Sequence, residues 1–184
     1  VAVTGFSISR RDFRSNERVR TSSMSREKIL YVATEDWYFV SDTLPLASAA
    51  HAKGYQVAVA ARANGKEDII GRAGLEFHPL NRISRGGTGL VSEAQSIAEL
   101  TRLYRALAPD LVHHIALKPI LYGALAARQL PQTALVNSVM GLGFVVTSQS
   151  AKAQALRPFM AMALRLTLSR ERSRTLVQIA DDLE

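Results

Sequence analysis

The chain contains no cysteine, so disulfides, thiol nucleophiles and cysteine-ligated metal sites are excluded. It has no apolar run near the roughly 20 residues that a membrane-spanning helix needs, and its first residues lack the apolar core of a signal peptide. No spacing of His, Asp and Glu is typical of a metal set, and no G-x-S-x-G turn is present to hold a nucleophilic serine. We therefore expect a cytoplasmic protein that uses no metal and no organic cofactor.

Acidic residues are the scarcer charge, with 16 of them against 23 basic residues and a net charge of +7. The excess is concentrated in residues 1–28, which hold seven basic and three acidic residues. Residues 1–25 show little periodicity and many Ser and Arg, so we expect a basic, disordered tail before one domain over 26–184. Because the basic residues are not interleaved with exposed aromatic ones, an anionic ligand or membrane surface is the expected partner, and not nucleic acid.

Short apolar runs alternate with helical patterns through residues 26–184. The runs are rich in β-forming residues, which is typical of strands buried on both faces of a parallel sheet. This alternation predicts an α/β fold: a Rossmann-like, doubly wound parallel sheet of about six strands in the order 3-2-1-4-5-6. The predicted strands are 29–33, 56–61, 75–80, 111–117, 133–139 and 174–179. The predicted helices are 44–50, 66–74, one that has Ser92 as its N-cap, 120–130 and 152–170.

Ligands of such sheets bind at the carboxyl ends of the strands, where the strand order reverses. Here the reversal falls between the first and fourth strands, so the polar turn 34–39 and residues 113–118 are predicted to line one crevice. Glu35 and Asp36 offer carboxylates that accept hydrogen bonds from sugar hydroxyls or act as a base, although Asp36 equally suits a helix cap. Trp37 and Tyr38 offer flat aromatic surface for a sugar ring or a lipid, or pack beneath the loop.

Two adjacent histidines lie in the fourth predicted strand. His113 and His114 point to opposite faces of the sheet, so one metal cannot be bound by both through this strand. Either ring reaches the crevice as an acid, base or substrate contact, or is a hydrogen-bonded histidine beneath a helix. Lys118 follows the strand, where it faces an anionic group or solvent. The candidates for catalysis are therefore Asp36, His113 and His114.

Four segments together resemble the N-terminal half of bacterial family 4 glycosyltransferases of the GT-B fold, over about Lys28 to Asp182. They are KILYVATEDWYFVSDTLPLASAAHAKGYQVAVAAR, GLEFHPL, APDLVHHIALKPILYGALAARQL and ALVNSVMGLGFVVTS. They are most similar to the subgroup that builds lipid-linked or capsular saccharides. The resemblance implies an acceptor-binding domain of an enzyme that transfers a hexosyl or N-acetylhexosaminyl group from a nucleotide-sugar donor to a saccharide or polyprenyl-diphosphate-linked acceptor. The implied substrate-binding residues are Glu35, Asp36, Trp37, Tyr38, Asp42, His114, Lys118, Asn137, Gly141, Gly143 and Thr147.

The sequence departs from the family pattern in two places. Asp42 and Thr43 stand where the family usually has His and Arg, and Ile179-Ala180 stands where it has Asn-Pro before its donor-binding domain. We expect the donor-binding domain to be missing or separate, and this chain alone to be inactive. The alternative is a non-catalytic, membrane-associated subunit that recruits a separate donor-binding chain. Basic and apolar residues in the predicted helix 152–170 are compatible with contact with the anionic inner face of the plasma membrane.

Overall fold

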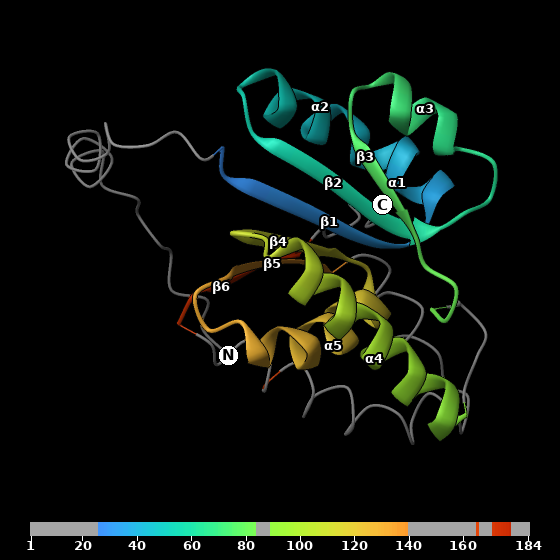
Figure 1. The fold of residues 1–184 in the computed structure, drawn as a ribbon, viewed down its shortest axis with the longest axis vertical. Coiled ribbons are helices and arrows are strands. Elements are labelled where there is room, and N and C mark those ends of the chain that lie inside the picture. Colours follow the sequence, from blue (N-terminus) through green and yellow to red (C-terminus); the bar gives the residue numbers. More distant parts are fainter. Residues whose placement is uncertain (1–25, 84–88, 140–164, 166–170, 178–184) are drawn as a thin grey trace, which may run out of the picture.

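The computed structural model describes residues 26–83, 89–139, 165 and 171–177 (Figure 1). Its centre is one sheet of six parallel strands in the order β3-β2-β1-β4-β5-β6. The predicted fold class and strand order are therefore confirmed. The strands are β1 (Lys28–Glu35), β2 (Gln56–Arg62), β3 (Glu76–Pro79), β4 (Leu111–Ile115), β5 (Ala134–Val139) and β6 (Ser173–Val177).

Helices cover the sheet on both faces, with α1, α2 and α3 on one side and α4 and α5 on the other (Figure 1). Parallel strands require such crossovers, because the chain must return to the same edge before each new strand. The helices are α1 (Asp36–Asp42), α2 (Leu44–Ala52), α3 (Glu67–Arg72), α4 (Leu90–Leu107) and α5 (Leu117–Ala126), and a 3-10 turn η1 (Ala127–Gln129) follows α5. Within the described ranges, no helix is both long and apolar enough to span a bilayer.

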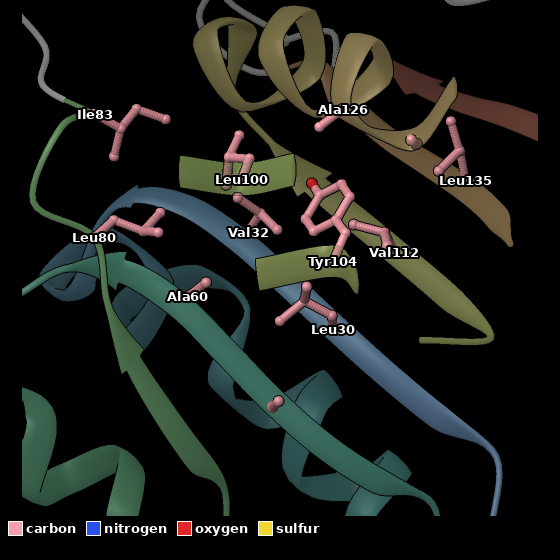
Figure 2. Packing of buried hydrophobic residues seen from close by; sticks show 12 residues of the cluster. Leu30, Val32, Ala60, Leu80, Ile83, Leu100, Tyr104, Val112, Ala126 and Leu135 are labelled. Atoms are coloured by element: carbon pink, nitrogen blue, oxygen red, sulfur yellow. The ribbon is translucent and has the colours of Figure 1, made fainter. Parts of the chain in front are cut away.

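Alternate side chains of β1 enter two different hydrophobic clusters. Leu30 and Val32 lie under α4 and α5, where Tyr104 is also fully buried (Figure 2). Tyr31 and Ala33 point to the other face, under α1, α2 and α3. Burial on both faces explains why this strand is a continuous apolar run with no polar side.

The first helix begins earlier than the sequence pattern predicted. Residues 35–39 were expected to form a polar turn, but β1 continues to Glu35 and α1 starts at Asp36. The Asp36 carboxylate accepts a hydrogen bond from the backbone N–H of Trp37 at 2.6 Å, which satisfies an amide of the first turn. Helix α1 has only seven residues, which are too few for a helical periodicity to show in the sequence, so the segment looks like a turn.

Several further boundaries differ from the predicted ones; helix α5, for example, begins at Leu117 and not at Ile120. The N-cap of α4 is Gly89 and not Ser92, whose hydroxyl donates to the Gly89 carbonyl at 2.7 Å from inside the helix. Strand β4 ends at Ile115 because Ala116 has φ 74° and ψ 167°, a conformation that interrupts the strand and is unusual for a residue with a Cβ. The predicted tail 1–25 and the predicted helix 152–170 lie outside the described residues, except for the helical Arg165.

Helix α5 lies very close to β4 because it carries Gly123 at the contact. A Cβ on Gly123 would come within 2.1 Å of His114 Nε2 and 2.7 Å of the Tyr104 hydroxyl. Both of those side chains are fully buried, so neither has free space into which it moves. The close packing of α5 on the sheet therefore requires a glycine here.

We expect Gly123→Ala to lower the free energy of unfolding by about 3 kcal/mol, because the methyl group overpacks a filled core. The matched control is Gly71→Ala in α3, where no atom lies within 4 Å of the added Cβ. That change should stabilise the protein by about 0.5–1 kcal/mol, since alanine favours a helix. Urea unfolding of both variants tests the pair, and equal effects of the two substitutions would contradict the packing argument.

Candidate functional site

The strand order reverses between β1 and β4, which are hydrogen-bonded neighbours in the sheet. From β1 the chain proceeds to β2 on one side, and it returns to β4 on the other. The helices that follow these two strands therefore leave the sheet on opposite faces, as the two groups of helices in Figure 1 show. This arrangement brings the residues after Glu35 and after Ile115 together at the carboxyl-terminal edge of the sheet, the edge formed by the ends of the strands. Ligands bind there in open parallel sheets.

Asp36 lies at this edge with no exposed surface. Besides Trp37, its carboxylate accepts hydrogen bonds from the backbone N–H groups of Asn64 at 2.7 Å and Lys66 at 2.9 Å. These two amides flank Gly65, whose φ of +83° forms the turn between β2 and α3. The sequence left open for Asp36 a contact with substrate or a cap of the following helix. Its observed contacts go beyond a cap, because its two oxygens accept from one amide of α1 and from two amides of the turn after β2.

Glu35 is nine-tenths buried beside this anchor. Its Oε2 accepts a hydrogen bond of 2.5 Å from the side-chain amide of Asn64. No other donor among the described residues reaches the carboxylate, so Oε1 keeps its capacity to accept hydrogen bonds. Glu35 is thus a carboxylate that Asn64 holds by one oxygen, while the other oxygen is able to accept a further hydrogen bond.

His113 and His114 point to opposite faces of the sheet, as their adjacency in the strand predicted. The Nε2 atom of His113 shares a hydrogen bond of 2.7 Å with the hydroxyl of Ser138, and its ring lies 5.2 Å from that of Tyr31. Only 6% of His113 is exposed. Burial lowers the pKa of His113 to about 4, so the ring is neutral at physiological pH.

His114 forms the centre of a buried hydrogen-bond chain across the sheet. Its Nε2 lies 2.8 Å from the hydroxyl of Tyr104, and its Nδ1 lies 2.8 Å from Oδ1 of Asn137. The amide of Asn137 donates in turn to the hydroxyl of Ser173 at 3.0 Å. Because Oδ1 only accepts, Nδ1 carries the proton and Nε2 accepts from the tyrosine. His114 is fully buried, so this arrangement is that of a satisfied core histidine.

Lys118, in the first turn of α5, belongs to a small polar cluster with α4. Its Nζ lies 3.6 Å from Oε1 of Glu93, and the other oxygen of Glu93 accepts a hydrogen bond from the hydroxyl of Tyr122. Burial, together with this carboxylate, raises the pKa of Tyr122 well above its ordinary value. The cluster holds the lysine near the carboxyl end of β4.

The remaining predicted site residues are less constrained by the described contacts. Trp37 is 40% exposed and packs edge-to-face on Tyr38, with ring centroids 5.7 Å apart. Asp42 is exposed at the end of α1, where it accepts a hydrogen bond from the hydroxyl of Thr43. Gly141, Gly143 and Thr147 lie outside the described residues.

Three residues of this edge were not found from the sequence. Asn64 follows β2 directly, so the rule that ligands meet the carboxyl ends of strands would have indicated it. Glu93 and Tyr122 carry no such signal, because only the packing of α4 beside α5 places them next to Lys118. Among the described residues, no group of three or more His, Asp or Glu side chains is arranged to hold a metal ion.

Comparison with known proteins identifies the sequence at the level of a family. The sequence profile described as Glycosyl transferase 4-like matches residues 28–178. No match was found among the curated proteins. The matched range includes all six described strands and the whole edge described above.

Solved structures with the same fold are distant in sequence. MurG of Acinetobacter baumannii matches with a TM-score of 0.50 and 16% identity over 71% of this chain and 39% of its own. The glycosyltransferase SnogD of Streptomyces nogalater matches with a TM-score of 0.50 and 22% identity, over 84% and 44%. A putative UDP-N-acetylglucosamine 2-epimerase of Listeria monocytogenes matches with a TM-score of 0.50 and 14% identity, over 79% and 42%. This chain thus spans less than half of each neighbour, and the likeness is one of fold.

The low pKa of His113 predicts a dependence of stability on pH. In the unfolded chain a histidine has a pKa near 6.5, so between about pH 6.5 and 4 the unfolded state binds more protons than the folded state. The free energy of unfolding should therefore fall as the pH is lowered through this range, by up to about 3 kcal/mol. His113→Phe removes this contribution, so urea unfolding at pH 7 and pH 4.5 should show a smaller loss for the variant than for the wild type. His51→Gln, a change of an exposed histidine, should keep the wild-type loss; an equal loss in all three proteins would contradict the assignment.

Proposed function

This chain belongs to the glycosyl transferase 4-like family, and we propose that residues 28–178 form the acceptor-binding half of a glycosyltransferase of the GT-B fold. The enzyme would transfer a sugar from a nucleotide-sugar donor to a saccharide or polyprenyl-diphosphate-linked acceptor. The donor would be bound by residues outside this half. The observation that carries the proposal is the edge at the strand reversal, where Glu35 ends β1 and Lys118 follows β4.

The charges along this edge support an acceptor with an anionic group. Basic side chains follow three of the strands. Of the nearby carboxylates, that of Asp36 is occupied by backbone amides, and that of Glu93 lies 3.6 Å from Lys118. Phosphate oxygens are bound well by basic side chains, which act as charge-assisted donors. The basic residues are Arg62 at the end of β2, Lys66 beyond it, Arg82 after β3 and Lys118 after β4.

The predicted site residues divide into two groups by their burial. Trp37, Tyr38 and Lys118 reach the surface at this edge, and we assign them to the acceptor together with Glu35, which is nine-tenths buried but whose Oε1 accepts no hydrogen bond from the described residues. We assign Asp36, His114 and Asn137 a supporting role, because their polar atoms bind other parts of the protein. Gly141, Gly143 and Thr147 remain predictions from the family resemblance, and so does a contact of Asp42 with substrate.

A lipid-linked acceptor would place the enzyme at a membrane surface on the cytoplasmic side, where nucleotide sugars are available. The exposed Trp37 is compatible with such a position, because its ring is amphipathic. The same ring suits stacking on a sugar.

Isothermal titration of the full chain with two ligands tests the proposed function. We expect a water-soluble, short-chain polyprenyl-diphosphate sugar to bind, and UDP not to bind. Binding of UDP alone would contradict the acceptor assignment. Binding of neither ligand would overturn the function and favour a scaffolding subunit.

Lys118→Ala gives the corresponding residue-level test. Loss of one charge-assisted contact to a phosphate should weaken binding of the diphosphate ligand by about 10-fold. The control is Lys53→Ala, which removes an exposed lysine at the end of α2, before β2 begins and so at the opposite edge of the sheet. Equal affinities of the two variants for the diphosphate ligand would show that Lys118 does not contact the phosphate.

A further inference from the structure

We propose that Asn64 is a positioning residue that holds Glu35 in the orientation to accept a hydrogen bond from a sugar hydroxyl of the acceptor. The inference rests on the proposed function and adds to it the group that distinguishes a sugar-bearing acceptor from the bare lipid diphosphate. It gives Asp36 an indirect role, because Asp36 fixes the turn from which Asn64 projects.

The described residues leave the hydrogen bonding of the Glu35 carboxylate incomplete. An ionised carboxylate that is nine-tenths buried is costly unless donors compensate it. The described residues supply it with one side-chain donor, from Asn64 to Oε2. Because Oε1 receives none of their hydrogen bonds, a ligand hydroxyl at this position would complete the shell of the carboxylate.

Asn64 is held in place through both its backbone and its side chain. Its backbone N–H is bound by the buried Asp36 carboxylate at 2.7 Å, and the N–H of Lys66, two residues on, is bound by the same oxygen at 2.9 Å. Its side-chain amide is shared between Glu35 and the carbonyl of Arg62, at 3.4 Å from the latter. Since Asp36 has no exposed surface, water cannot compete for these bonds. The exposed Asn64 is therefore held by a buried anchor.

The carboxylate of Glu35 favours one kind of ligand group over another. A carboxylate accepts hydrogen bonds and cannot donate them, so Glu35 suits a hydroxyl donor and repels a phosphate. The basic residues of the same edge suit the phosphate instead. We therefore assign the sugar of the acceptor to Glu35 and Asn64, and its diphosphate to the basic side chains.

An alternative is that the bond between Asn64 and Glu35 only fastens the turn after β2 to the end of β1. In that case its loss would loosen the whole edge, and sugar-bearing and sugar-free ligands would be affected alike. Comparison of two probes, the short-chain polyprenyl-diphosphate sugar and the same polyprenyl diphosphate without its sugar, distinguishes the two roles.

Titration calorimetry of the full chain with both probes is the test. We expect Glu35→Gln and Asn64→Ala to weaken binding of the sugar-bearing probe by about 10- to 100-fold, the loss of one hydrogen bond to a charged group. Neither variant should weaken binding of the sugar-free probe, because neither removes a donor to the phosphate. The control is Asn81→Ala, which removes an exposed asparagine after β3 at the same edge and should change neither affinity.

A second variant tests the orientation itself. Asn64→Asp places two carboxyl groups in contact, and such a pair holds one proton more tightly than an isolated carboxyl group does, so a fall in pH restores a donor between them. The variant should bind the sugar-bearing probe nearly as well as the wild type at pH 5 and at least 10-fold more weakly at pH 8, and thermal unfolding should verify that it is folded at both.

The outcomes are separable. Equal weakening of both probes by Asn64→Ala would leave the acceptor function in place and overturn the positioning role, and so would unchanged binding of both. Failure of the wild type to bind either probe would overturn the proposed function and this inference together.

Discussion

Strand β1 has hydrogen-bonded neighbours on both sides and helices on both faces, so all its residues from Leu30 to Glu35 are buried. All features of the candidate site depend on this constraint. The carboxylates of Glu35 and Asp36 lie at the carboxyl end of β1, where the strand order reverses. Because β1 is central and covered on both faces, the residues at its carboxyl end have one defined place in the fold.

Buried polar groups reinforce this edge from beneath. Asp36 binds three backbone amides, and His114 and Asn137 extend a hydrogen-bond chain from α4 to β6. A polar group in the core is costly when it lacks partners, but it specifies one arrangement when all its partners are present. The two networks fix the turn after β2 on one side of the reversal and the packing of α5 on the other. The surface residues between them are therefore presented by a rigid support.

The fold alone does not determine the chemistry. MurG, the glycosyltransferase SnogD and a putative UDP-N-acetylglucosamine 2-epimerase match this chain with equal TM-scores of 0.50. Such a fold hosts several reactions, and function has to be argued from the site. Here the family assignment supports sugar transfer, whereas the division of the edge into carboxylate and basic groups supports the assignment of the acceptor.

The sequence by itself determined the fold class, the strand order and the edge at which to search, because hydrophobic periodicity and the handedness of crossovers are local or general rules. It also placed His113 and His114 on opposite faces. It did not determine which of two roles Asp36 has, nor that Asn64, Glu93 and Tyr122 belong to the edge. Those contacts join residues up to 30 positions apart, such as Asp36 and Lys66. Only tertiary packing decides them, because a side chain's partners depend on which segments the fold brings together.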